Sequence, residues 1–582
     1  MNVKKSVAML LAAACLCSFT SCADAKTSDE WKAAAVMDEY HPNKTITGNF
    51  DSRLAAKCVN GTFVGKQIGD VTVWKGIPFA EQPVGDLRFR APKAPAPSNR
   101  VYEAYHFMKS GMQSIDPDEK ASVYEQGEEC LGLNIWKNTQ GTDKKPVLVF
   151  IHGGGWMSGG TADSLYNGYN FANDNPDILV VTVDYRLGML GQIDLSSFPD
   201  GAEFKGSEAL CMLDLVQSLK WIKENISAFG GDPDNVTISG ESAGGGAVSM
   251  LCVMPEARGL FTKAIPMSGS VTQFNDVSNA RDQIAALRKE FGANTVKDLQ
   301  RIPFPKLKKW WGLNVGDIYH HPLKGNSVIE ADPLDAWVRG DSSDITIMQG
   351  HTANEFRYYI TVFGGLERVY DAVCKGKVLN ALENGDAEYA AAYREYNDAL
   401  RTAGRSEADI SHAYMDDYAF NAGMLYQAEM HAKNGGKGFF YTFEKGYDGD
   451  YSYMGAAHAI DCFYMFGSFD GNCALGTDEE VELSRKFQRM IANFCKTGDP
   501  STDGLTWPEY KNDTKYRMMI GMNMRAERDP ESERNAAVMK MMSIKDSPFL
   551  GEGNEKTLIE GAAKLDPEAV AQLKAILMER QK

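Results

Sequence analysis

The stretch Asn235-Val236-Thr237-Ile238-Ser239-Gly240-Glu241-Ser242-Ala243-Gly244 decides the fold of this chain. Its first half is rich in β-branched residues and predicts a buried strand, and the small residues 245–248 that follow predict the start of a helix. The glycines on either side of Ser242 permit a strained turn that lifts the hydroxyl clear of the sheet. The positive end of the following helix then faces that hydroxyl. Ser242 is therefore a candidate nucleophile.

Strands and helices alternate around this turn. The spacing of apolar residues over 208–225 predicts a helix, and strand-forming runs occur at 147–151, 177–183, 345–348 and 438–443. This alternation predicts an α/β fold with a mostly parallel central sheet and helices on both faces. Segments 278–327 and 369–424 are rich in Ala, Leu, Glu and Lys and predict helices inserted over an active site.

The composition narrows the class of protein. The chain has 582 residues, of which 43% are hydrophobic and 24% charged, as in ordinary globular proteins. Its net charge of −17 argues against nucleic acid as a partner, because phosphate binding needs clustered Lys and Arg. No C-x-x-C spacing occurs, so we expect no structural zinc, and we expect no other metal or cofactor. Cys462 and Cys473 are close enough to bridge a loop, with free buried thiols as the alternative.

The N-terminus has the pattern of an export signal. Two lysines precede the apolar run 7–19, which is too short to span a bilayer. The sequence Phe19-Thr20-Ser21-Cys22 resembles a bacterial lipobox, in which Cys22 is lipidated, and we favour this reading. The alternative is ordinary cleavage after Ala25 in Ala23-Asp24-Ala25, which would give a periplasmic or secreted protein. No later apolar run is long enough to span a membrane, so a lipid anchor is the only membrane attachment expected.

A glycine-rich loop directly follows the strand at 147–151. It reads His152-Gly153-Gly154-Gly155-Trp156, and its glycines allow the backbone to approach a substrate and present N–H groups. This is the HGGG type of loop, which forms an oxyanion hole together with the N–H of the residue after the nucleophile. The predicted oxyanion donors are the N–H groups of Gly154, Gly155 and Ala243.

With this loop the chain resembles the type-B carboxylesterase family, which includes the cholinesterases. The resemblance extends from about Gly61 to Tyr510. It rests on Gly76-Ile77-Pro78-Phe79-Ala80, Glu128-Glu129-Cys130-Leu131, Leu133-Asn134-Ile135-Trp136, Asp184-Tyr185-Arg186-Leu187-Gly188, Phe229-Gly230-Gly231-Asp232-Pro233 and the segment from Phe494 to Pro500. It implies an α/β-hydrolase fold and a serine hydrolase that cleaves small carboxylic esters.

The resemblance also implies the other two members of a catalytic triad. Glu355 occupies the place of the family acid in Gly350-His351-Thr352-Ala353-Asn354-Glu355-Phe356, where Asn354 and Phe356 depart from the usual Asp and Gly. His458 occupies the place of the family histidine in Gly455-Ala456-Ala457-His458. The order Ser242, Glu355, His458 is that of α/β-hydrolases. Glu241 and Asp461 match acidic positions near the family site and are expected to support it electrostatically.

The mechanism that the resemblance implies is acyl transfer through Ser242. His458 takes the Ser242 proton, Glu355 orients the imidazole, and water resolves the acyl-enzyme. Cholinesterase activity is not supported, because the loop 113–129 lacks the Trp that cholinesterases use to hold choline. Two alternatives stay open: a catalytically silent adhesion or binding protein on the same fold, and an amidase or lactonase using the same triad.

These patterns divide the chain into four parts. Residues 1–21 are the predicted lipoprotein-type export signal, and 22–57 a tether or loose arm. Residues 58–530 form the predicted α/β-hydrolase domain, and 531–582 a helical C-terminal extension that includes an amphipathic helix over 556–582. The oligomeric state is not determined by the sequence.

Overall fold

The computed structural model describes residues 41–113, 125–276, 281–314, 321–329, 332–362, 365–469, 476–544, 547–549 and 561–572. The predicted export signal, Cys22 and Cys473 lie outside these residues. Within them, no helix is long and apolar enough to cross a membrane.

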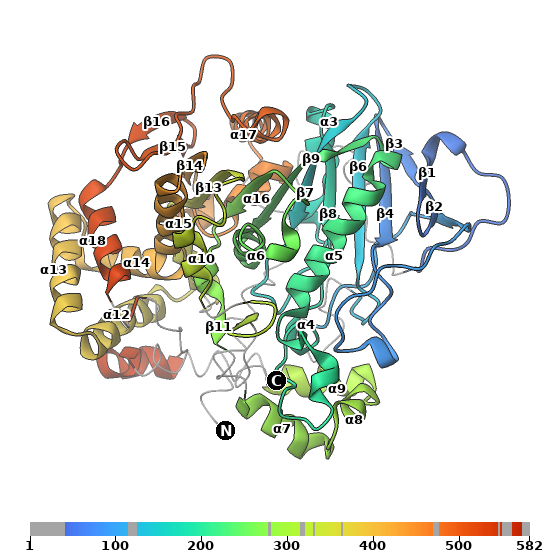
Figure 1. The fold of residues 1–582 in the computed structure, drawn as a ribbon. Coiled ribbons are helices and arrows are strands. Elements are labelled where there is room, and N and C mark those ends of the chain that lie inside the picture. Colours follow the sequence, from blue (N-terminus) through green and yellow to red (C-terminus); the bar gives the residue numbers. More distant parts are fainter. Residues whose placement is uncertain are drawn as a thin grey trace.

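A large twisted sheet forms the centre of the described chain (Figure 1). Its eleven strands follow the order β16-β15-β14-β13-β10-β9-β7-β8-β6-β4-β3. The strands from β8 to β15 in this order are parallel, whereas β6, β4 and β3 at one edge and β16 at the other are antiparallel. Their bounds are β3 (Lys66–Ile68), β4 (Val71–Pro78), β6 (Gly132–Asn138), β7 (Lys145–Ile151), β8 (Leu179–Val183), β9 (Gly231–Glu241), β10 (Lys263–Met267), β13 (Thr346–Thr352), β14 (Gly438–Phe443), β15 (Tyr516–Ile520) and β16 (Arg525–Arg528). The predicted mostly parallel sheet is confirmed.

Helices cover both faces of this sheet, because its central strands are apolar on both sides. Along β7, Val149 faces one apolar cluster and Phe150 the other, and both are fully buried. The first cluster includes α5 (Leu210–Asn225) and α6 (Ala243–Leu251). The second includes α3 (Tyr169–Asp174), α16 (Ile460–Phe466) and α17 (Asp478–Thr497). The prediction of helices on both faces is therefore confirmed.

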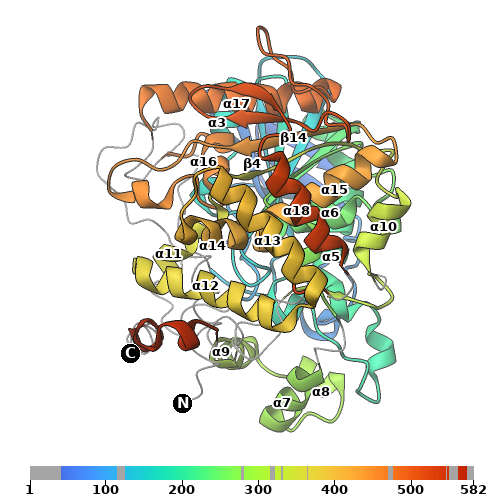
Figure 2. The same ribbon diagram turned by 90° about the vertical axis from the view of Figure 1, so that its left-hand side faces the viewer.

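Two further helical groups are inserted between the strands. The first contains α7 (Arg281–Phe291), α8 (Val296–Gln300) and α9 (Phe304–Asn314). The second contains α12 (Glu367–Asn384), α13 (Ala387–Thr402) and α14 (Glu407–Asp416), followed by the π-helical turn η12 (Asp417–Asn421) and α15 (Ala422–Lys433). In Figure 2, α12 and α7–α9 lie in the lower half of the molecule, on the opposite side from α3 and α17.

The packed domain begins earlier than the sequence predicts. Asn43, which was assigned to a loose arm over 22–57, donates to the Lys75 carbonyl at 2.9 Å and accepts from the Tyr105 N–H at 2.9 Å. Strand β1 (Ala55–Cys58) pairs with β2 (Gly61–Val64). The described part of the arm, from residue 41, is therefore held on the domain by hydrogen bonds and, at Ala56 of β1, by burial in the first apolar cluster.

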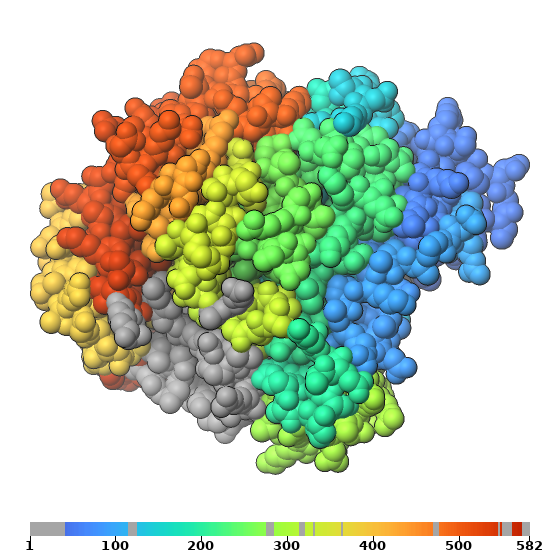
Figure 3. Space-filling model, viewed as in Figure 1, coloured from blue at the N-terminus to red at the C-terminus, as the bar shows by residue number. Residues whose placement is uncertain are grey.

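The C-terminal region also packs into the domain instead of extending from it. Helix α18 (Ser532–Ser543) shares an apolar cluster with α12, α13 and α14 and lies against α13 (Figure 3). Beyond it, residues 561–565 and 567–572 are helical with a break at Asp566, so the described part of 556–582 is not one continuous helix. The boundary predicted at 530 is thus not a boundary of the fold.

The described cysteines are free and buried: Cys58, Cys130, Cys211, Cys252, Cys374, Cys462 and Cys495. A bridge from Cys462 to Cys473 cannot be described, since Cys473 lies outside the described residues. Among the described side chains, no group of three His, Cys, Asp or Glu has the geometry to hold a metal ion.

Candidate active site

The candidate site residues lie at the carboxyl ends of neighbouring parallel strands. Ser242 follows β9, and the glycine loop from His152 follows β7. Glu355 follows β13 by three residues, and His458 lies on the connection from β14 to α16. Because the carboxyl ends of parallel strands meet at one edge of a sheet, segments more than 300 residues apart in sequence converge there.

Ser242 sits in the strained turn that the sequence predicts. Its backbone has φ 58° and ψ −123°, a conformation that side-chain-bearing residues rarely adopt. The turn is held because the Ser242 N–H donates to the Met267 carbonyl of the next strand at 2.9 Å. A Cβ at Gly244 would lie 2.1 Å from the Ile151 carbonyl oxygen, so only glycine allows α6 to approach β7 this closely.

Glu355 and His458 form a buried pair. His458 Nδ1 lies 2.5 Å from Glu355 Oε2. The other oxygen of Glu355 accepts from the Ser268 hydroxyl at 2.6 Å and from the Thr352 N–H at 2.8 Å. Burial alone would raise the pKa of Glu355, but the charge and hydrogen bond of His458 and the bond from Ser268 outweigh it and lower the pKa. Glu355 is thus an ionised acceptor that fixes which histidine nitrogen carries a proton.

The other nitrogen of His458 faces a second carboxylate. Nε2 lies 3.1 Å from Glu241 Oε1, and no hydrogen bond joins His458 to Ser242 in the described structure. Burial lowers the pKa of His458, but Glu241 and Glu355 raise it, with a net result of about 9. Burial raises the pKa of Glu241 to about 8. The contact between Glu241 and His458 is one of charge and not a hydrogen bond, because Glu241 Oε1 is buried without a hydrogen-bond partner. In unliganded enzymes the catalytic hydrogen bonds are often not yet formed.

Asp461 lies in the same buried acidic environment. Its Oδ2 accepts from the Tyr441 hydroxyl at 2.8 Å. Burial, followed by the charge of Glu355, raises the pKa of Asp461 to about 7. Asp461 contributes to the raised pKa of both His458 and Glu241.

The glycine loop passes directly beside Ser242. A Cβ added at Gly153 would lie 3.0 Å from the Ser242 Cβ. The next residues, Gly154 and Gly155, have φ of 106° and 60°, which glycine adopts without strain. Ala243 is the first residue of α6, so its N–H has no acceptor within that helix. The three predicted oxyanion donors are thus on segments that flank the Ser242 side chain.

Two side chains in contact with the pair were not found from the sequence. Ser268 directly follows β10, and a polar residue at a strand's carboxyl end was the signal available for it. Phe420 stacks on His458, with ring centroids 4.2 Å apart, but it comes from an inserted helical segment whose sequence gives no such signal.

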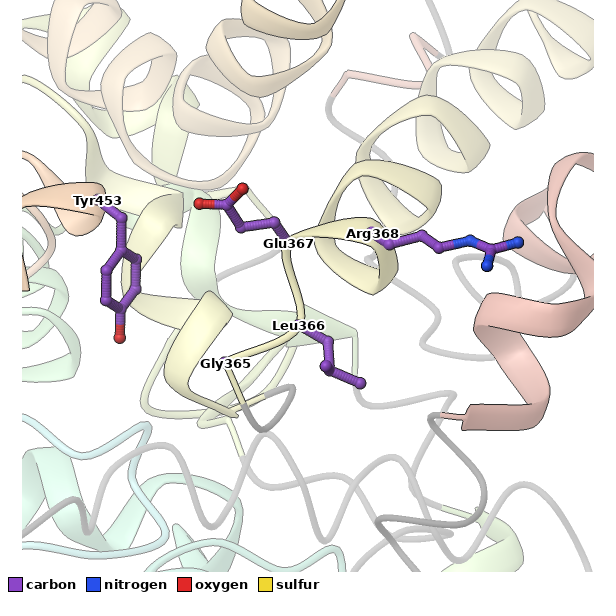
Figure 4. A pocket seen from close by; sticks show the side chains of 5 residues that line it. All are labelled: Gly365, Leu366, Glu367, Arg368 and Tyr453. Carbon is purple, nitrogen blue, oxygen red and sulfur yellow. The ribbon is translucent and has the colours of Figure 1, made fainter.

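A hollow of about 440 Å³ opens on the surface near these segments (Figure 4). It is lined by Gly365, Leu366, Glu367, Arg368 and Tyr453. Tyr453 belongs to η13 (Gly449–Met454), which leads to His458, and Glu367 begins α12, which follows Glu355 along the chain. In Figure 4 the Arg368 side chain extends away from Tyr453, toward the C-terminal helical segment, whose Asp566 it contacts at 2.8 Å.

The chain is similar to known esterases over most of its length. The para-nitrobenzyl esterase of Bacillus subtilis (strain 168) is 31% identical over 501 residues, which cover 81% of this chain and 96% of that protein. An acetylcholinesterase of Leptinotarsa decemlineata is 28% identical, with 76% of this chain and 78% of that protein covered.

Solved structures of esterases are also similar to this chain. That of a thermophilic PNB esterase matches with a TM-score of 0.71 at 28% identity, covering 84% of this chain and 100% of that chain. A Geobacillus stearothermophilus carboxylesterase matches with a TM-score of 0.70 at 28% identity, covering 83% and 100%. A model of the carboxylesterase family matches residues 53–538. The chain therefore belongs to the carboxylesterase family and is a carboxylic ester hydrolase with the α/β-hydrolase fold.

Proposed function

We propose that this protein hydrolyses small carboxylic esters through an acyl-enzyme on Ser242, with His458 as general base and Glu355 as the acid that orients it. The observation that carries the proposal is the buried Glu355–His458 hydrogen bond, at 2.5 Å, in the same site as the strained Ser242 turn. A nucleophile, a base and a group that orients the base are what serine acyl transfer requires.

In the proposed first step, Ser242 Oγ attacks the ester carbonyl while His458 Nε2 takes its proton. For this, Nε2 must exchange its contact with Glu241 for one with the Ser242 hydroxyl. The N–H groups of Gly154, Gly155 and Ala243 then hold the oxyanion, and losing one such donor typically costs about 100- to 1,000-fold in rate. His458 next returns its proton to the leaving alcohol.

In the second half, water attacks the acyl group with His458 again as base, and the acid product leaves Ser242. Throughout the cycle Glu355 stays ionised, because its two oxygens accept bonds from His458, Ser268 and Thr352. The proposed steps use only side chains and backbone groups of this chain, the ester and water.

Covalent labelling tests the nucleophile. A fluorophosphonate probe is expected to label the wild-type protein at Ser242, and Ser242→Ala is expected to lose both labelling and p-nitrophenyl acetate hydrolysis. Ser249→Ala is the matched control, because Ser249 is a buried serine of α6 that donates to the Gly269 carbonyl at 2.9 Å. Hydrolysis at the wild-type rate by Ser242→Ala would exclude the proposed mechanism.

A substrate panel tests the bond that is cleaved. Matched acyl, aryl and sugar esters are compared with an anilide and a lactone under the same conditions, and the esters are expected to have the higher kcat/KM. A preference for the anilide or the lactone would assign the triad to amidase or lactonase chemistry instead.

We also propose that the protein is exported and carries lipid on Cys22. The proposal rests on the lysines, apolar run and lipobox-like residues of the N-terminus. Labelled palmitate is expected to be incorporated into the wild-type protein and not into Cys22→Ser. A mature, unlabelled protein that begins at Lys26 would show ordinary cleavage after Ala25.

A further inference from the structure

The ring of Phe420 covers one face of the His458 imidazole. The two ring centroids are 4.2 Å apart and the planes are inclined by 31°, which is close to a stacked arrangement. Phe420 is 7% exposed, yet it is not a member of the apolar clusters that the described residues form. The ring contact described for Phe420 is the one with His458.

The backbone that carries Phe420 is π-helical. The turn η12 interrupts an otherwise regular helix between α14 and α15. Such single π turns are rare and occur frequently at functional sites, because the extra residue changes the direction in which the side chains point. Here the turn contributes Phe420 to a site whose other members come from strand ends.

Buried polar contacts hold this turn in place. Asp417, its first residue, accepts from Arg534 Nε and from Arg534 NH2, both at 2.9 Å. The same carboxylate accepts from the Tyr396 hydroxyl at 2.8 Å and from Asn421 Nδ2 at 3.2 Å. Because Arg534 lies on α18 and Tyr396 on α13, two separate helices fix the position of η12.

Other side chains can pack against His458 mainly on the two faces of its ring. Both nitrogens face carboxyl groups, Nδ1 toward Glu355 and Nε2 toward Glu241, and Asp461 is a third carboxyl group that acts electrostatically on His458. Tyr358 meets the ring from a different direction, at 6.3 Å and 60°. A benzene ring stacked on the imidazole restricts its rotation, and its π face attracts the imidazolium cation.

We propose that Phe420 is a positioning residue for this esterase: it holds the plane of the His458 ring and stabilises the imidazolium that forms as Ser242 attacks. It acts through His458 and not through the ester. The proposal rests on the proposed function, in which His458 is the general base. According to this proposal, the π turn contributes to catalysis by holding Phe420. Helix α18 supports that turn through Arg534.

Replacing the ring by an aliphatic side chain of similar size tests the proposal. Phe420→Leu is expected to lower kcat by roughly 3- to 10-fold, with KM within about twofold of the wild type, since the interaction is made with the transition-state cation. Losing this attraction removes stabilisation of the protonated form, so the rise of kcat/KM with pH is expected to move to lower pH. Phe420→Tyr keeps the ring and is expected to restore kcat and the pH profile to near wild-type values.

Controls separate this role from a loss of folding. Rates are expressed per fluorophosphonate-titrated site, so that only folded enzyme is counted. Phe229→Leu is the matched variant, because Phe229 is a buried aromatic residue that packs edge-on against Trp74 at 5.1 Å, in a different cluster. It is expected to lower Tm but to leave kcat and the pH profile unchanged.

Two outcomes overturn the proposal. Unchanged kcat and pH profile in Phe420→Leu would show that the ring does not act on His458. A change confined to KM would show that Phe420 contacts substrate instead. Neither outcome affects the proposed function, which fails separately if Ser242→Ala or His458→Gln keeps wild-type activity.

Discussion

At the scale of single residues, Ser268 shows how the buried acid is held. Its hydroxyl donates to Glu355 Oε1 at 2.6 Å, and the Thr352 N–H donates to the same oxygen. Hydrogen bonds to charged groups contribute about 1.5–3 kcal/mol, and removing this one leaves Thr352 as the remaining donor. We therefore expect Ser268→Ala to lower kcat by roughly tenfold with KM little changed.

Steady-state kinetics with p-nitrophenyl acetate measures this effect. Ser249→Ala again serves as the control, since it removes a buried serine hydroxyl that contacts a backbone carbonyl and not the triad. Equal losses in the two variants would mean that Ser268 has only a structural role.

The contact between Glu241 and His458 predicts how kcat/KM depends on pH. The pKa of His458 is raised to about 9, and Glu241 is the largest cause that raises it. A protonated His458 cannot accept the Ser242 proton, so kcat/KM is expected to increase as the pH rises through about 9. Glu241→Gln removes the negative charge and lowers the pKa of His458, so the increase is expected at lower pH.

Measuring kcat/KM against pH for the wild type and for Glu241→Gln tests the direction of this shift. Glu208→Gln is a suitable control, because Glu208 is also a partly buried carboxyl with a raised pKa but is not among the groups that shift His458. A shift of the Glu241→Gln profile to higher pH would contradict the assigned effect of the Glu241 charge on His458.

At the scale of elements, the approach of α6 to β7 decides where Ser242 is held. A methyl group at Gly244 would meet the Ile151 carbonyl oxygen at 2.1 Å, and backbone on both sides leaves no flexible atom to move. Gly244→Ala is expected to push α6 away from the sheet at a cost on the order of 1–3 kcal/mol, and to displace Ser242 with it. A lower Tm and a rate of fluorophosphonate labelling reduced by at least tenfold are the expected results.

Gly48→Ala is the control for this substitution, because a Cβ at Gly48 has open space around it. It is expected to change Tm by less than a degree or two and to leave labelling unaffected. Normal labelling in Gly244→Ala would show that the turn tolerates a displaced helix.

Element by element, the strands were more predictable than the inserted helices. The run 438–443 corresponds to β14 residue for residue, because six consecutive buried apolar or β-forming residues leave few alternatives. Segment 369–424 was predicted to be helical, and it is, but the π turn at η12 was not predicted. Its position depends on Arg534, more than 100 residues away, and no local pattern records that contact.

At the scale of the whole molecule, residues 561–572 act as part of the helical group around α12. A Cβ at Gly376 would lie 2.3 Å from the Ala562 backbone nitrogen, so the two segments are in backbone contact. Ala562 and Ala569 are fully buried, and Val570 is nearly so. Deleting residues 561–582 is expected to lower Tm by several degrees and to expose α12 to proteolysis, because this apolar surface would meet water.

Thermal unfolding and limited proteolysis measure the effect of the deletion. Arg368→Ala is the control, since Arg368 is half exposed and its solvent-exposed ion pairs with Asp566 and Glu568 are expected to contribute little to stability. An unchanged Tm in the deletion variant would mean that the segment does not support α12.

The amino-acid sequence by itself determined the α/β architecture, the Ser242 turn, the glycine loop and the family to which the chain belongs. These features depend on residues that are adjacent in the chain, where apolar periodicity, glycine spacing and turn geometry act locally. The family resemblance added Glu355 and His458, and the structure brings these two into contact.

Only the tertiary structure decided what surrounds the pair. It placed Glu241 rather than Ser242 against His458 Nε2, stacked Phe420 on the ring, and held Asn43 and α18 against the domain. The physical reason is that these contacts join residues far apart in sequence. Their strength comes from burial and from charges that folding brings close together. Neither can be predicted from a short stretch of sequence.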